Sequence, residues 1–210
     1  MNRDEVWETI DDQRRSLADL FDDLADHEWE APSLCAAWRV RDVAAHLTLA
    51  HTGMGPAVLG LLRARGNVNR MIRDTALRQA ELPVDSYAPM LREMVGSRAK
   101  APGVTEMEPL IDVLVHGQDI AIPLSRTRPM PPEAAAAAAS RVWPKLWPFR
   151  AERRLHGMKL VATDHSWTAG EGLLVEGPIS AVLLLLTGRR AALTMLAGPG
   201  VPKLEARLAA

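Results

Sequence analysis

A carboxylate and an imidazole stand four residues apart in the segment IDVLVHGQD, as Asp112 and His116. On a helix, residues four apart lie one above the other on the same face, so both side chains can reach a common point. Both side chains are potential metal ligands, and facing helices of a bundle can each contribute ligands that project into its interior. The spacing therefore predicts two ligands of a metal site, with a third supplied from elsewhere in the chain.

His46 is the best candidate for the third ligand. Val43, Leu47 and Ala50 share its helical face, which we assign to the core, so its imidazole is expected to point inward. In the alternative interpretation, His46 is a core histidine with one hydrogen bond, and Asp112 pairs with an arginine as buried carboxylates commonly do. Spacing alone leaves both interpretations open, because a carboxylate and a histidine four apart are frequent in ordinary helices.

The remaining histidines fall outside this predicted ligand face. His51 lies about 140° around the helix from His46, given roughly 100° per residue, so we expect it at the surface or at the mouth of the site. His27, His156 and His165 fall in predicted loops or near strand ends, where a solvated histidine is expected.

Two further polar features are ambiguous in the sequence. Cys35 stands between Leu34 and Ala36, where a small buried hydrophobe is the favoured interpretation and a nucleophile is the alternative. The pair Arg189-Arg190 is either a solvated charge pair or a contact for an anion.

Composition excludes several classes of protein. The 210 residues are 48% hydrophobic and 24% charged, which is typical of a globular domain. With 25 Lys and Arg against 26 Asp and Glu, the net charge of -1 argues against nucleic-acid binding. A charged N-terminus and a single cysteine favour a cytoplasmic protein over a secreted one. The apolar stretch 179–187 is about half of the roughly 20 residues that span a bilayer, so no membrane segment is expected.

Segments with helical periodicity make up most of the first 128 residues. The pattern over 40–63 runs through Gly53 and Gly55, and the two patches at 71–80 and 87–95 are compatible with one kinked helix. Short links between such helices predict a four-helix bundle over residues 1–128. The predicted helices are 4–25, 40–63, the patches 71–80 and 87–95 as two helices or one kinked helix, and 109–122, with a connecting loop at 27–38.

The character of the chain changes after Pro129. Pro131 and Pro132 precede an alanine run, and we interpret 129–150 as a linker helix. Residues 151–210 are predicted to form a small α/β domain, with strands at 158–163 and 172–175 and a buried helix at 178–186 that ends at Gly188. The predicted fold class is therefore mainly α, with a bundle followed by a small α/β domain.

The stretch APSLCAAWRVRDVAAHL, residues 31–47, resembles the TPCPGW-VRDV-AHL signature of the mycothiol-dependent maleylpyruvate isomerase family. The family's second signature, an acidic ligand followed by a VH histidine and a nearby aspartate, resembles residues 112–119. The tail, from Trp167 to the Gly188-Arg189 pair, resembles the family's small C-terminal α/β domain. The resemblance covers most of the chain, although this chain has Asp112 where the isomerase has glutamate.

The resemblance implies a DinB-like bundle that holds one divalent metal ion through His46, Asp112 and His116. Two histidines and one carboxylate leave positions for water or substrate, which is the open arrangement of catalytic zinc, so Zn²⁺ is the expected ion. The family's thiol cofactor is mycothiol, and a divalent ion lowers the pKa of a coordinating thiol. Two further residues are catalytic candidates: Asp119, as a partner of the ligands, and Arg189, which resembles an arginine that the family needs and would hold a substrate carboxylate.

The sequence therefore predicts a metal-dependent, mycothiol-using isomerase or S-transferase that acts on a small electrophilic substrate. One alternative is a non-catalytic protein of the same fold that binds a ligand or a partner and keeps the metal as a fixture. Another is a metal-dependent hydrolase, in which the ion activates water instead of a thiol.

Overall fold

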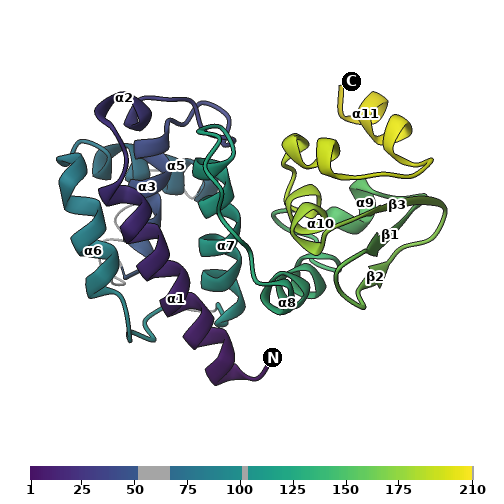
Figure 1. The fold of residues 1–210 in the computed structure, drawn as a ribbon, viewed down its shortest axis with the longest axis horizontal. Coiled ribbons are helices and arrows are strands. Elements are labelled where there is room, and N and C mark those ends of the chain that lie inside the picture. The colour runs from purple at the N-terminus through teal and green to yellow at the C-terminus, as the bar shows by residue number, and fades with distance from the viewer. Residues whose placement is uncertain (52–66, 101–103, 210) are drawn as a thin grey trace. The chain divides into compact units, whose positions relative to one another are not determined.

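The computed structural model describes residues 1–51, 67–100 and 104–209. The chain forms two compact units, one made of Asn2–Arg128 and the other of Pro129–Ala210 with Met1. Most of the structured residues are helical, and the strands form one small sheet in the second unit, which confirms the predicted fold class (Figure 1). Among the described residues, every helix is too short or too polar to span a lipid bilayer.

The first unit is a helical bundle in which α1 packs against α6 and α7, while α3 packs against α5 and α7 (Figure 1). Its elements are α1 (Arg3–Asp22), α2 (Asp26–Trp29), α3 (Val40–Leu47), the 3₁₀ turn η1 (Thr48–His51), α5 (Val68–Gln79), the 3₁₀ turn η2 (Val84–Ser86), α6 (Tyr87–Glu93) and α7 (Met107–Ala121).

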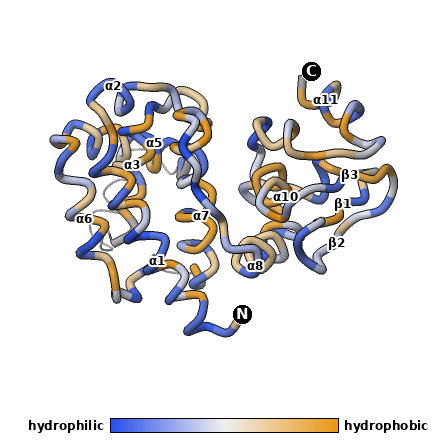
Figure 2. The backbone as a smooth tube through the Cα atoms, viewed as in Figure 1, coloured by the Kyte–Doolittle hydropathy of each residue, from blue (hydrophilic) through white to orange (hydrophobic). Residues whose placement is uncertain are grey.

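Local sequence explains why α1 begins where it does. The side chain of Asn2 accepts hydrogen bonds from the backbone N–H groups of Asp4 and Glu5, and the Glu5 carboxylate accepts one from the backbone N–H of Asn2. This reciprocal cap satisfies backbone donors that the first turn of a helix leaves without partners. The apolar residues of α1 alternate with polar ones at helical spacing, as the mixed colours in Figure 2 show, so one face of the helix enters the core.

Several predicted boundaries in the bundle differ from the structure. The helix predicted over 40–63 ends at Leu47 and continues as η1 to His51, and the rest of that prediction falls on residues 52–66, outside the described residues. The patches at 71–80 and 87–95 form two separate helices, α5 and α6, because the chain turns through η2 between them. The predicted loop at 27–38 contains most of the short helix α2.

The second unit contains a three-stranded sheet with strand order β2-β1-β3. β1 (Met158–Ala162) pairs parallel with β3 (Leu173–Gly177) and antiparallel with β2 (Thr168–Ala169). Helix α10 (Ile179–Leu186) packs against both β1 and β3, and also against α8 (Pro132–Val142). The remaining elements are α9 (Ala151–Arg154), the 3₁₀ segment η3 (Arg190–Met195) and α11 (Val201–Ala209).

Helix α10 is the core of the second unit. It is apolar apart from Ser180, mostly orange in Figure 2, and nearly all of its side chains are buried. The Asp164 carboxylate accepts a 2.7 Å hydrogen bond from the backbone N–H of Ile179 and so caps its first turn. Gly188, at φ +94°, ends the helix in the left-handed region that favours glycine, as predicted.

The alanine-rich segment predicted as a linker belongs to the second unit in the structure. Ala134, Ala135, Ala138 and Ala139 of α8 are fully buried, and α8 packs against α10. Small side chains allow two helices to approach closely, so the alanine run forms a packing surface within this unit.

Candidate metal centre

The start of α3, the helix that carries His46, is fixed by Asp42. The Asp42 carboxylate, which is only 2% exposed, accepts a 2.8 Å hydrogen bond from the backbone N–H of Arg39. The Arg39 guanidinium donates to the same carboxylate through Nε at 3.1 Å and Nη2 at 2.9 Å. This two-pronged, charge-assisted contact anchors the first turn of α3, and His46 follows one turn later.

Helix α7 supplies the other two predicted ligands. Eleven of its fifteen residues are buried, including Ile111, Val113 and Val115 around the predicted pair. Asp112 and His116 are exceptions on this helix, because both remain accessible to solvent. A helix that is otherwise enclosed thus presents one carboxylate and one imidazole, one turn apart, at an accessible point.

The structure brings the three predicted ligands together. One donor atom from each of His46, Asp112 and His116 lies within 4.8 Å of the other two. The rings of His46 and His116 meet edge to face, with centroids 4.9 Å apart and an interplanar angle of 80°. Bonds of roughly 2.0–2.2 Å to one ion require donor atoms no more than about 4.4 Å apart, so small side-chain rotations suffice to form a three-ligand site.

The surroundings of His46 keep its imidazole neutral. The ring packs against that of Trp38, with centroids 5.5 Å apart. Burial and the neighbouring His116 together lower the pKa of His46 to about 3, against the opposing effect of Asp119. Neutral imidazole is the form of histidine that binds a metal ion.

Asp119 and Cys35 both contact Nδ1 of His116. Nδ1 of His116 lies 2.8 Å from Oδ2 of Asp119, and the Cys35 thiol donates to the same oxygen at 3.1 Å. Burial lowers the pKa of His116, but the hydrogen bonds to Asp119 and Cys35 outweigh this effect and raise it to about 10. Without a metal ion, these contacts favour the protonated form of His116.

Cys35, His116 and Asp119 form a second group of potential ligands that shares one histidine with the first. Its internal distances are 2.8 Å between His116 and Asp119, 3.1 Å between Cys35 and Asp119, and 3.7 Å between Cys35 and His116. Tetrahedral bonds of about 2.0–2.3 Å to a common ion separate the donor atoms by roughly 3.3–3.8 Å. Both groups meet the same 4.8 Å limit, and the short contacts in the second group also suit a role in orienting His116.

The loop that carries Cys35 is joined to α7 at the same aspartate. The backbone N–H of Leu34 donates to the backbone carbonyl of Asp119 at 3.1 Å. Within the loop, the Ser33 hydroxyl donates to the carbonyl of Trp38 at 2.8 Å and accepts from the backbone N–H of Cys35 at 3.1 Å. Residues 31–39 are therefore held against α7 by backbone as well as side-chain bonds.

Cys35 is not the small buried hydrophobe that its apolar sequence neighbours indicated. The sequence predicted a small buried hydrophobe, whereas the structure shows a half-buried thiol that is hydrogen-bonded beside His116. Spacing could not have found this contact, because the loop has no periodicity and meets α7 some eighty residues later. The only signal in the sequence is the position of Cys35 within the motif at residues 31–47.

The other singled-out residues lie elsewhere. Arg189 belongs to the second unit, where its Nη1 donates to the backbone carbonyl of Thr187 at 2.8 Å just beyond α10. His27 and His156 are exposed, as expected. His165 differs from the prediction, because it is half-buried and its Nε2 lies 3.3 Å from a carboxylate oxygen of Glu133. The side chain of His51 lies outside the described part of the structure.

Comparisons with known proteins agree with this architecture. The family model of the mycothiol maleylpyruvate isomerase N-terminal domain matches residues 10–121. A crystal structure of the mycothiol-dependent maleylpyruvate isomerase is 14% identical, with a TM-score of 0.66, and the alignment covers 95% of this chain and 93% of that chain. A histidine-to-alanine mutant of that isomerase gives a TM-score of 0.64 at the same identity and coverage. The comparison with curated protein sequences finds no match.

The two solved structures show that 95% of the chain shares their fold, since the alignment runs through both units. The family match covers more than half of the chain and includes His46, Asp112, His116 and Asp119. The chain therefore belongs to the mycothiol maleylpyruvate isomerase family.

Proposed function

We propose that this protein is a metal-dependent isomerase that uses mycothiol and acts on a small electrophilic acid of the maleylpyruvate type, with one divalent ion held by His46, Asp112 and His116. The observation that carries the proposal is the convergence of these three donors, from α3 and α7, within 4.8 Å of one another. Family membership supports the thiol and the class of reaction, because the solved relatives are named as mycothiol-dependent isomerases.

The donor set fits a catalytic ion. Two imidazole nitrogens and one carboxylate leave at least one coordination position for an exchangeable ligand, whereas a structural zinc site is closed by four protein ligands. Nitrogen and oxygen donors in this number suit Zn²⁺ among the first-row ions. Asp112 and His116 are accessible to solvent, so a small thiol and a substrate can reach this point.

Each residue of the site has a distinct role in this proposal. His46 offers a neutral nitrogen from a ring packed against Trp38. Asp119 holds Nδ1 of His116, which leaves Nε2 as the nitrogen for the ion and fixes the orientation of the ring. When bound, a divalent ion lowers the pKa of a coordinating thiol, which then acts as a thiolate nucleophile at neutral pH.

Arg189 is the proposed contact for the substrate's negative charge. A guanidinium binds a carboxylate through two parallel N–H groups, and such a contact orients an acidic substrate for attack by a thiolate. Arg189 already uses Nη1 on the carbonyl of Thr187, which limits the rotamers of the side chain.

The test is an activity assay of the purified protein with maleylpyruvate, run with and without mycothiol, before and after removal of metal with a chelator. We expect turnover only when both thiol and metal are present, with the thiol recovered unchanged at the end. Consumption of one thiol per product would instead identify an S-transferase. Turnover that survives chelation, or that needs no thiol, would contradict the proposal.

A further inference from the structure

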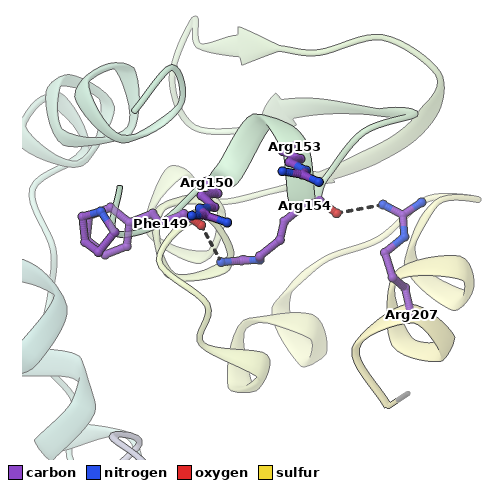
Figure 3. A pocket seen from close by; sticks show the side chains of 6 residues that line it. Phe149, Arg150, Arg153, Arg154 and Arg207 are labelled. Atoms are coloured by element: carbon purple, nitrogen blue, oxygen red, sulfur yellow. Dashed lines mark hydrogen bonds between the residues drawn. The ribbon is translucent and has the colours of Figure 1, made fainter. Parts of the chain in front are cut away.

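A pocket of about 560 Å³ lies within the second unit, next to the short helix α9 (Figure 3). Four of the six residues that line it are arginines, and the other two form an apolar wall. The lining residues are Pro148, Phe149, Arg150, Arg153, Arg154 and Arg207. The volume is in the range of about 300–1,000 Å³ that is typical of small-molecule sites.

All charged groups that line this pocket are positive. Its lining contains four guanidinium groups and no carboxylate. The segment 129–210 carries ten Lys and Arg against six Asp and Glu, so four of its ten basic residues gather around one cavity. Guanidinium groups stay charged at neutral pH, and like charges this close repel one another unless an anion lies between them.

Two of the arginines are fixed in place by backbone carbonyls. Arg154 donates through Nη1 to the carbonyl of Phe149 at 3.2 Å and through Nη2 to the carbonyl of Leu185 at 2.9 Å. Arg207, on α11, donates through Nη1 to the carbonyl of Arg154 at 2.9 Å (Figure 3) and to that of His156 at 3.1 Å. Carbonyls carry no net charge, so these bonds position the two guanidinium groups without neutralising them.

The other two arginines have no comparable partners. In residues 1–51, 67–100 and 104–209, nothing forms a hydrogen bond or an ion pair with the side chain of Arg150 or Arg153. Arg150 caps the start of α9 and Arg153 lies on α9, so both side chains reach the pocket from one element. The pocket therefore combines two fixed guanidinium groups with two whose N–H groups can turn toward a ligand.

We propose that this pocket is a second binding site, distinct from the metal centre, that takes a small phosphorylated organic molecule. One guanidinium satisfies both oxygens of a carboxylate, whereas four around one cavity match the larger number of oxygens and the higher charge of a phosphate. The wall formed by Pro148 and Phe149 provides an apolar surface for the organic part of the ligand.

The test is isothermal titration of the full, metal-loaded chain with phenyl phosphate and, separately, with inorganic phosphate. We expect saturable binding of phenyl phosphate that is tighter than that of inorganic phosphate. The double substitution Arg150→Gln with Arg153→Gln should weaken binding at least about tenfold, because it removes charge-assisted hydrogen bonds. The control is Lys159→Gln with Lys203→Gln, which removes the same charge from exposed residues of the same unit outside the pocket, and it should change the affinity less than about twofold.

Three outcomes would overturn the proposal. Equal weakening by both double variants would show a general charge effect, and binding unaffected by the arginine variant would place the phosphate elsewhere, at the metal centre for example. Binding to vesicles that contain phosphatidic acid, without binding of either soluble phosphate, would identify a membrane surface as the ligand. Far-ultraviolet circular dichroism and the thermal midpoint of each variant must match the wild type, which separates loss of the site from loss of the fold.

Discussion

Nδ1 of His116 lies 2.8 Å from Oδ2 of Asp119, a carboxylate whose side chain is completely buried. A buried carboxylate is costly unless it is paired, so the contact fixes both side chains at once. Because Nδ1 is occupied, Nε2 is the nitrogen that the ring can offer to a metal ion. We therefore propose that Asp119 orients His116 as a ligand and does not itself bind the ion.

The substitution Asp119→Asn tests that assignment. The asparagine oxygen can still accept from Nδ1–H, so the protein should keep its metal with an affinity lowered by about ten- to a hundredfold. The measurement is competition with a chelator of known affinity, with Asp112→Asn as the matched comparison. If both variants lost the metal to the same degree, Asp119 would have to be counted among the ligands.

Asp42 is expected to stabilise the bundle through the first turn of α3. Asp42→Ala removes the hydrogen bonds to the backbone and guanidinium of Arg39, and should lower the free energy of unfolding by about 1–3 kcal/mol. Urea denaturation gives the value. Glu30→Ala is the control, because Glu30 also pairs with Arg39 but its side chain is 51% exposed, and it should cost less than about 1 kcal/mol. If Asp42→Ala and Glu30→Ala lowered the free energy of unfolding equally, Asp42 would have no special role in stabilising α3.

Ala37 is predicted to be a strained position in the loop beside the metal centre. Its φ of +64° lies in the left-handed region, which costs an L-residue about 1–2 kcal/mol and glycine almost nothing. After the larger entropy loss of glycine is subtracted, Ala37→Gly should raise the free energy of unfolding by up to about 1 kcal/mol. Ala36→Gly, at a residue outside the left-handed region, should lower it. The measurement is urea denaturation. If Ala37→Gly and Ala36→Gly shifted the unfolding midpoint in the same direction, Ala37 would not be strained.

Arg189 is predicted to act on the substrate and not on the metal. Arg189→Ala should lower kcat/KM for an acidic substrate at least about tenfold while the metal content stays unchanged. Arg190→Ala, at the adjacent exposed arginine, is the charge-matched control and should retain most of the activity. If Arg189→Ala had wild-type kinetics, Arg189 would have no role in catalysis, and the catalytic residues would all lie in the bundle.

The proximity of the three candidate ligands could be predicted from the sequence because two of them follow from helical spacing. Asp112 and His116 are one turn apart on α7, and His46 shares a face of α3 with the buried residues Val43 and Leu47. Periodicity carries this information without any knowledge of tertiary contacts. The buried helix α10 and its end at Gly188 were predictable for a different reason, because a continuous apolar run is followed by a glycine that can end a helix.

The remaining features depend on contacts between distant segments. The bond from Cys35 to Asp119 joins a loop without periodicity to a helix far along the chain, so its sequence neighbours pointed to a hydrophobe. The separation of α5 from α6 depends on a turn whose residues are compatible with a continuous, kinked helix. The packing of α8 on α10 could not be told from a linker, because alanine favours a helix in either setting.

The metal content of two single variants tests the central claim most directly. Elemental analysis of the wild type should find about one divalent ion per chain, with zinc expected. His46→Ala should lose that ion, because only two ligands remain, while Cys35→Ser should keep it, because serine can still donate to Asp119. Full occupancy in His46→Ala together with loss in Cys35→Ser would place the ion at Cys35, His116 and Asp119 and contradict the account.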